Sequence, residues 1–221
     1  MGNPLLAHPR NTEFDLGFAA KPHRYTLSPL LFFSKIDNDI TFYAATIQQA
    51  IPGVKSKTAK TYANLQAYQW GGELAGSAPI TSFLVAYGNL SYTRGTKVPQ
   101  PGIAILSSNL FQVPPLKSQL TLRYEKKHIY SEASAIVTGR QDHVDTDELE
   151  KATAGYSIFN FRAGYRTGTL HFEGGVNNLL SRQYSEFLSY ARGPYTNGIR
   201  LPEPGRNFFV NMAWTMKRKV E

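Results

Sequence analysis

The chain has 221 residues, of which 42% are hydrophobic and 13% aromatic, and its formal net charge is +8. Mean hydropathy is −0.32, and no apolar run approaches the ~18 residues of a membrane helix, so we expect no helical membrane protein. Cysteine is absent, which excludes disulfides and thiolate metal sites. The basic residues are dispersed without a nucleic-acid-binding motif, so we expect no nucleic-acid partner.

Alternation of apolar and polar residues recurs along the chain, and this two-residue period predicts strands that lie between two different media. In the first segment, Phe14, Leu16 and Phe18 alternate with polar or small residues. The second segment contains Pro29, which predicts a bulge or a local break. The nine predicted strands are residues 12–20, 25–35, 62–76, 82–93, 119–124, 128–140, 159–166, 170–177 and 209–216.

The connections between these strands alternate between short and long. The short ones are residues 20–23, 77–81, 125–127 and 166–168, and the long ones are 37–60, 94–116, 141–155 and 181–205. A membrane barrel has short turns on its periplasmic side and long loops outside, whereas a soluble meander has no need of this regularity. The sequence therefore predicts an all-β fold, an antiparallel transmembrane β-barrel portion of about nine strands.

Two other classes remain open at this point, a soluble β-rich binding domain and a porin-like passive channel. In a soluble sandwich the apolar face would be the core, and the outer face would be rich in Lys and Glu. The polar face here carries Asn, Gln, Ser, Thr, Gly and Arg, which is more typical of a wet lumen. The composition of this face favours the barrel.

Several motifs occur in an order that resembles the TonB-dependent outer-membrane receptors. They are Gly2-Asn3-Pro4, Asp15-Leu16-Gly17, the set Asn64, Ala67, Gly71 and Glu73, then Leu90–Gly95, Pro114-Pro115-Leu116, Gly175–Leu179, Tyr184 and Pro202–Phe209. That family has a barrel of about 22 strands with a plug inside it. The resemblance implies that residues 1–216 are the C-terminal β-barrel segment of such a receptor, followed by a basic tail at 217–221.

The resemblance also implies a function and partners. Such receptors sit in the outer membrane of Gram-negative bacteria, contact its lipid and lipopolysaccharide, and import a ferric siderophore, haem, cobalamin or a similar metal complex. The plug and the box that binds TonB belong to an N-terminal region that this sequence lacks, so we expect a fragment. An open sheet leaves unpaired edges, which lipid cannot satisfy, so we expect no transport by the chain alone.

The last long loop carries the candidate ligand contacts. Aromatic rings stack on planar chelators, and arginine pairs with anionic groups. The alternative is that these residues pack the loop or contact lipid headgroups. The candidates are Tyr184, Glu186, Tyr190, Arg192 and Tyr195.

An acidic run at residues 142–148 is the remaining cluster with possible chemistry. Its carboxylates are of the type that binds a hard cation, but the glycine and spacing of a calcium loop are missing, so we favour a solvated acidic loop. The five histidines have no metal-ligand spacing. No catalytic constellation stands out, so we expect no enzyme, no cofactor and no metal site.

Overall fold

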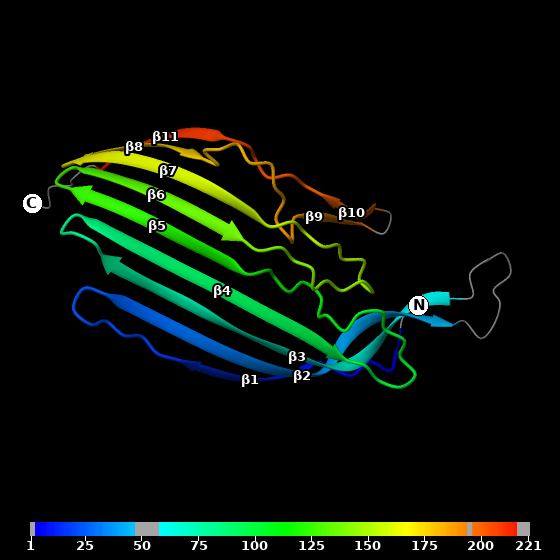
Figure 1. The fold of residues 1–221 in the computed structure, drawn as a ribbon. Helices are drawn as coiled ribbons and strands as arrows, with labels where there is room; N and C mark the ends of the chain where they lie inside the picture. The colour runs from blue at the N-terminus through cyan, green and yellow to red at the C-terminus, as the bar shows by residue number, and fades with distance from the viewer. Residues whose placement is uncertain (1–2, 47–57, 194–195, 216–221) are drawn as a thin grey trace, which may run out of the picture.

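The computed structural model describes residues 3–46, 58–193 and 196–215, and their fold is all-β (Figure 1). Nine strands form one antiparallel sheet in the order β1-β2-β3-β4-β5-β6-β7-β8-β11, and β9 and β10 form a separate hairpin. The bounds are β1 (Arg10–Gly17), β2 (Thr26–Thr46), β3 (Thr58–Pro79), β4 (Leu84–Val98), β5 (Lys117–Lys126), β6 (Ile129–Thr138), β7 (Tyr156–Thr167), β8 (Leu170–Asn177), β9 (Tyr190–Gly193), β10 (Thr196–Arg200) and β11 (Asn207–Trp214). Within these residues, no helix is long and apolar enough to cross a membrane.

All nine predicted strands are present in the sheet, but two of them are much longer than predicted. Strands β2 and β3 stay paired as far as Thr46 and Thr58, so residues 37–46 and 58–60 are strand, and the prediction of a loop there was wrong. The aromatic pair of Phe42 and Tyr62, with ring centroids 5.2 Å apart, stabilises this extension. Met216 and the predicted tail at 217–221 lie outside the described residues.

The predicted bulge at Pro29 is absent, and its absence has a local cause. Pro29 pairs with Leu74 in unbroken register, and the irregularity of β2 lies between Ile36 and Asp39 instead. The carbonyl of Pro29 accepts from the amide of Phe18, just beyond the end of β1. In an antiparallel strand the nitrogen of Pro29 faces the same side, so its missing N–H leaves out a single ladder bond opposite Phe18, and the pairing resumes at the bridge of Ala20 with Leu27.

The two ends of the sheet differ in the length of their connections, as predicted. Two-residue turns join β5 to β6 and β7 to β8, and four residues join β3 to β4. The long connections between β4 and β5, β6 and β7, and β8 and β11 all lie at the opposite end (Figure 1). We call these the short-turn end and the long-loop end.

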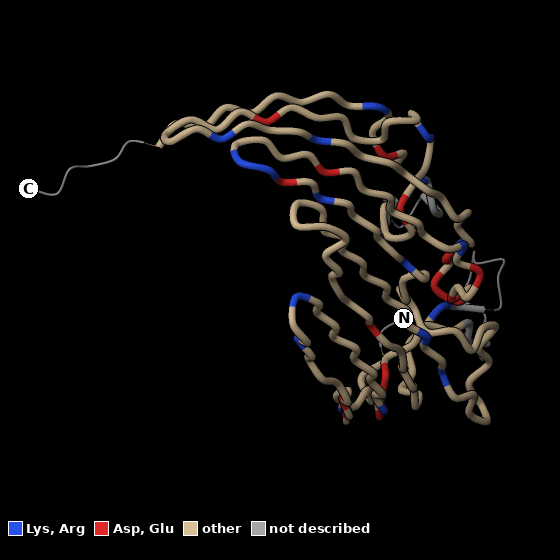
Figure 2. The backbone as a smooth tube through the Cα atoms, turned by 60° about the vertical axis from the view of Figure 1, so that its left-hand side comes forward, with Lys and Arg blue, Asp and Glu red and all other residues tan. Residues whose placement is uncertain are grey.

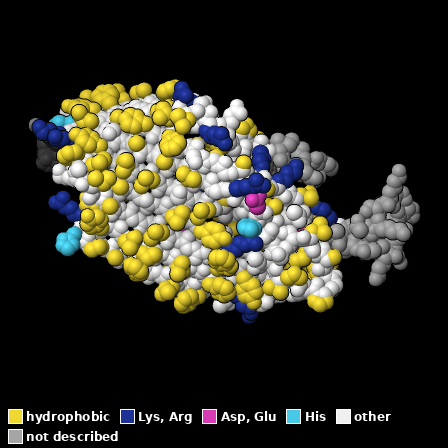
Figure 3. All heavy atoms as spheres, in the orientation of Figure 1, with side chains coloured by type: hydrophobic (Ala, Val, Ile, Leu, Met, Phe, Trp, Pro, Cys, Tyr) yellow, Lys and Arg dark blue, Asp and Glu magenta, His cyan; other side chains and the backbone are white. Residues whose placement is uncertain are grey.

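The sheet curves across its strands into an open trough with two chemically different faces (Figure 2). The outer face carries large apolar side chains that stay exposed along every strand, and Figure 3 shows them covering this face, with Lys and Arg mostly toward its ends. Examples are Leu16, Leu31, Leu120, Phe161 and Val210. A soluble sandwich would bury this surface as its core, whereas an exposed apolar outer face is the arrangement expected of a barrel wall.

On the inner face, three aromatic rings lie over glycines of the neighbouring strand. Each ring and its glycine are direct cross-strand partners, and a β-carbon added to the glycine would come within 2.6 Å of the ring or closer. Glycine is therefore required at these positions for the ring to lie against the wall. The pairs are Phe32 with Gly71, Tyr130 with Gly164, and Phe209 with Gly175.

Candidate functional site

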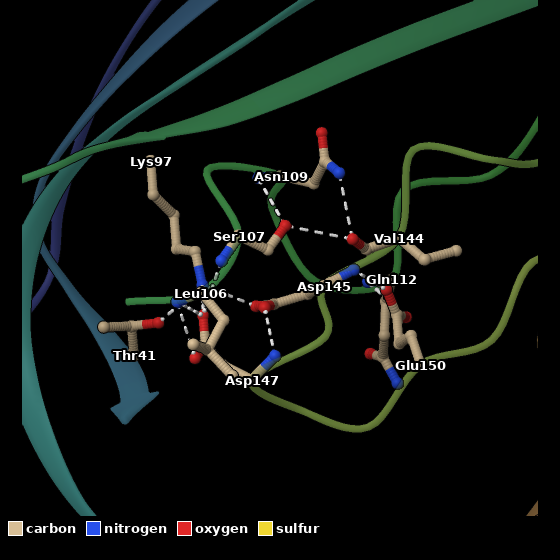
Figure 4. Close-up of polar contacts among 10 residues, drawn as sticks. All are labelled: Thr41, Lys97, Leu106, Ser107, Asn109, Gln112, Val144, Asp145, Asp147 and Glu150. Atoms are coloured by element: carbon tan, nitrogen blue, oxygen red, sulfur yellow. Dashed lines mark hydrogen bonds and ion pairs between the residues drawn. The ribbon is translucent and has the colours of Figure 1, made fainter. Parts of the chain in front are cut away.

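A buried lysine at the long-loop end organises the first part of the site (Figure 4). Lys97 lies near the end of β4, and its ammonium nitrogen is 2.7 Å from Asp145 and 3.5 Å from Asp147. It also donates to the hydroxyl of Thr41 on β2 at 3.0 Å. The side chains of the three charged residues are at most 2% exposed. We call Lys97, Asp145, Asp147 and Glu150 together the loop clasp.

The carboxylates of the loop clasp belong to the loop after β6, and they bind backbone amides of the loop after β4. Asp147 accepts from the amides of Leu106 and Ser107 at 3.0–3.1 Å. Glu150 accepts from the amides of Gln112 and Asp145, each at 2.9 Å. Residues 99–116 and 139–155 are therefore tied together through buried carboxylate–amide hydrogen bonds, which are strong because the acceptor is charged.

The loop at residues 99–116 also pairs with the edge of β4, beyond the point where β5 ends its pairing with that strand. The amide of Lys97 donates to the carbonyl of Ser108 at 2.7 Å, and the amide of Leu110 donates to the carbonyl of Gly95 at 3.1 Å. A β-carbon on Gly95 would lie 2.6 Å from that of Leu110. Glycine at this position thus allows the loop to pack closely against β4.

The acidic run at 142–148 was predicted to be a solvated loop, and this prediction was wrong for its central residues. Asp145 and Asp147 are buried because Lys97 and backbone amides satisfy their oxygens. Burial raises the pKa of Asp145 above its ordinary value, against the attraction of Lys97. Burial likewise raises the pKa of Glu148, and the nearby charge of Asp145 adds to the effect.

The second part of the site is an aromatic patch where the last long loop meets the start of β7. The ring of Tyr184 packs on that of Tyr156, with centroids 4.3 Å apart. Tyr156 also donates to the carboxylate of Glu186 at 3.4 Å, and Lys117 lies 3.5 Å from the same oxygen. Burial raises the pKa of Tyr184, and the charge of Glu203 acts in the same direction.

The structure brings together two of the five candidate ligand contacts from the last loop. Tyr184 and Glu186 share the patch with Tyr156. Tyr190 and Arg192 belong to β9, where Arg192 pairs with Asn197 of β10. Tyr195 lies outside the described residues.

The third part of the site is a ladder of alternating charges on the inner wall, toward the short-turn end. Its successive ion pairs cross four strands: Glu125 with Arg123 at 2.8 Å, Arg123 with Glu132 at 3.4 Å, Glu132 with Arg162 at 2.8 Å and Arg162 with Glu173 at 3.8 Å. Beside it lies a cavity of about 420 Å³, lined by Glu132, Arg162, Glu173 and Asn211 among others. The wall there is polar and nearly neutral in sum.

Tyr130 lies at the centre of this ladder and is only 2% exposed. Its hydroxyl donates to Glu173 at 2.5 Å, and its oxygen lies 2.8 Å from a ring nitrogen of His171. The guanidinium groups of Arg123 and Arg166 lie 5.4 and 4.5 Å from its ring centroid. Glycine at 164 makes room for the ring, so one small residue supports the whole arrangement.

No cluster of three or more His, Asp or Glu side chains that could hold a metal ion occurs among residues 3–46, 58–193 and 196–215. The acidic run is used by the loop clasp instead. The described mouth residues thus present the rings of Tyr156 and Tyr184 beside Lys117 and Glu186, and a polar wall lies toward the other end of the inner face.

Comparison with known proteins agrees with this architecture. A family model for "TonB dependent receptor-like, beta-barrel" matches residues 1–179. The chain belongs to the TonB-dependent receptor family. No curated protein sequence matches the chain.

Solved structures of TonB-dependent receptors share the fold. The copper transporter OprC aligns with a TM-score of 0.77 and 20% identity, over 96% of this chain and 33% of that one. The ferric-catecholate import receptor Fiu from E. coli aligns with a TM-score of 0.63 and 20% identity, over 93% of this chain and 27% of that one. A mutant ferric enterobactin receptor from Pseudomonas aeruginosa aligns with a TM-score of 0.66 and 18% identity, over 93% of this chain and 31% of that one. The chain thus spans about a third of the length of these structures.

Proposed function

We propose that this chain forms part of the barrel wall and extracellular mouth of a TonB-dependent receptor in the outer membrane of a Gram-negative bacterium. The observation that carries the proposal is the match of the barrel family together with a sheet that is apolar outside, polar inside and long-looped at one end. Lipid and lipopolysaccharide contact the outer face. The chain serves transport and has no catalytic role.

The transported ligand is a ferric siderophore or a similar metal complex. Support comes from the mouth, which presents the Tyr156–Tyr184 stack beside Lys117 and Glu186. Tyr190, Arg192 and Tyr195 are assigned to the same ligand surface from their place in the last long loop. Rings and cations of this kind bind planar, anionic chelators. Structural relatives named for copper, ferric-catecholate and ferric enterobactin transport are consistent with this class.

Transport needs strands that residues 1–221 do not supply. The edge strands β1 and β11 each have one unpaired side among the described residues, and both run from the long-loop end to the short-turn end. An antiparallel neighbour of either edge must run the opposite way. An odd number of further strands therefore closes the barrel, which gives an even total. We assign the plug and the contact with TonB to residues outside the present sequence.

Reconstitution tests this requirement. Liposomes that contain only the 221-residue chain are expected to show no substrate-dependent import, because unpaired edges in lipid leave backbone groups unsatisfied. Import by these liposomes would contradict the need for further strands.

Uptake by cells tests the function itself. Cells that carry the complete receptor, of which this chain forms part, are given radioactive iron as a ferric catecholate, with and without TonB. We expect saturable uptake that stops when TonB is deleted. Uptake that is equal in both strains and does not saturate would support a passive channel and contradict the proposal. A strain with Lys35→Met, which alters only an exposed ion pair with Asp37, serves as the control.

A further inference from the structure

An apolar groove of about 560 Å³ lies on the outer face near the short-turn end, across β2 to β5. One row of cross-strand partners crosses the groove. It consists of Leu27, Gly76, Gly88 and Leu120, which lie side by side on four successive strands. The leucines form the two sides and the glycines the floor. The groove lies on the face that Figure 3 shows.

The space over Gly88 is left empty by the protein itself. A β-carbon built on Gly88 meets no atom within 4 Å. Strands β3 and β4 both have paired neighbours on each side, so no additional strand can enter the sheet at this place. The surrounding surface is mostly apolar, and the backbone groups of β3 and β4 are already paired with neighbouring strands, which suits a hydrocarbon chain and not a peptide strand.

The groove ends at a turn that carries only positive charge. Pro22 and Tyr25 line this end, and they belong to the connection between β1 and β2, residues 18–25. That connection contains Lys21 and Arg24, and it contains no Asp or Glu. Tyr25 is exposed, as is typical of aromatic residues at the boundary between hydrocarbon and water. The apolar groove thus ends beside a positively charged turn.

We propose that this groove is a phospholipid site, in which one acyl chain lies over Gly76 and Gly88 and the phosphate group binds Lys21 and Arg24. The aliphatic floor and sides match the chain, and the two cations match the phosphate, which arginine and lysine bind through charge-assisted hydrogen bonds. The proposal goes beyond the transport function. It depends on the outer face being in a membrane, and it is independent of which ligand is imported.

Native mass spectrometry tests the site with phosphatidylglycerol as the probe. The complete receptor that contains this chain, purified from outer membranes in a mild detergent, is expected to retain a phosphatidylglycerol molecule in this groove, because the chain alone leaves unpaired sheet edges in lipid. Gly88→Leu fills the floor and should abolish retention. The double variant Lys21→Gln/Arg24→Gln should weaken the apparent affinity by roughly tenfold or more, since each cation near a lipid surface contributes appreciably. Lys21 and Arg24 are exposed and do not line the groove, so the charge variant leaves its apolar packing in place, and an unchanged thermal midpoint checks that it folds.

Matched controls separate the site from general contact with lipid. Gly174→Leu adds the same side chain on the outer face of β8, where a β-carbon would make ordinary contacts at 3.7 Å or more. Lys126→Gln/Lys127→Gln removes the same charge at another turn of the same end. Both controls should retain the lipid. No retained phospholipid in the unaltered receptor, or equal loss in site and control variants, would overturn the proposal. Neither result would bear on metal-complex uptake, so the two proposals fail separately.

Discussion

The ammonium nitrogen of Lys97 lies 2.7 Å from a carboxylate oxygen of Asp145, and each side chain is only 1% exposed. The two residues are separated by 48 positions and belong to β4 and to the loop that follows β6. Desolvation of both charges offsets most of their attraction, so a buried pair contributes little net stability relative to apolar residues. We therefore interpret the pair as a device that fixes the position of the loops.

Removal of the lysine should destabilise the mouth strongly. Lys97→Met leaves Asp145 and Asp147 buried without their cation, which costs about 3–5 kcal/mol. Urea unfolding in detergent measures the loss, and proteolysis of residues 99–116 and 139–155 reports where it acts. Lys35→Met removes a half-exposed ion pair and should cost about 1 kcal/mol or less. Equal effects of the two substitutions would contradict the role of the loop clasp.

A methyl group at Gly164 should disturb the inner wall. In Gly164→Ala the new β-carbon would lie 2.4 Å from the ring of Tyr130, so the ring must move away from Glu173 and His171. We expect a loss of about 1–3 kcal/mol in the free energy of unfolding. Gly174→Ala, on the outer face of the adjacent strand, is the control and should change it by about 0.5 kcal/mol or less. A loss as large in the control would indicate a general effect of glycine replacement.

Acid should not weaken the loop clasp. Burial raises the pKa of Asp145 in the folded chain above its unfolded value. The contribution of this group to stability is then fully present below the unfolded pKa and is lost as pH rises through the folded pKa. Asp147, whose oxygen is 3.5 Å from Lys97, still pairs with the lysine when Asp145 is protonated.

The comparison of the unaltered chain with Asp145→Asn isolates this effect. As the pH falls from neutral toward the ordinary pKa of an aspartate, the thermal midpoint of the unaltered chain should rise relative to that of the variant. A relative fall on acidification would show that Asp145 is stabilised as the charged form, opposite to the expected sign.

Substitution of Tyr184 distinguishes ligand binding from loop packing. Tyr184→Phe keeps the ring that packs on Tyr156 and removes the hydroxyl, whereas Tyr184→Ala removes both. If the ring stacks on the ligand, Tyr184→Ala should raise the ligand concentration for half-maximal uptake by roughly tenfold or more, a loss of about 1.4 kcal/mol. Tyr184→Phe should stay within about threefold. Unchanged uptake in Tyr184→Ala, with lower thermal stability, would assign the residue to packing alone.

The strands could be predicted from the sequence because apolar and polar residues alternate within each of them. Leu170 to Asn177 alternates without interruption, and the structure has a strand with those bounds. The end of β2 beyond Asp37, and the start of β3 that pairs with it, were missed. The irregularity between Ile36 and Asp39 shifts the alternation of apolar and polar residues in β2. A bulge leaves no local signal that distinguishes it from the start of a loop.

The loop clasp could not be predicted for a different reason. Lys97 stands at the end of an alternating strand, and Asp145 lies in an acidic run that resembles a solvated loop. Only the tertiary fold brings the loop that follows β6 to the end of β4, where the charges meet. The one usable signal was Gly95, since a glycine in a strand indicates a close approach of another part of the backbone.

Site-directed spin labelling of single cysteines along β5 tests the central claim most directly, and the natural absence of cysteine gives a clean background. Labels at residues 119 to 124 are compared for collision with oxygen, which concentrates in lipid, and with a polar nickel complex in water. The account predicts a two-residue alternation, with Leu120, Leu122 and Tyr124 accessible to oxygen and Gln119, Thr121 and Arg123 accessible to nickel. Uniform access of the nickel complex, or no alternation, would contradict a wall that separates lipid from a polar lumen.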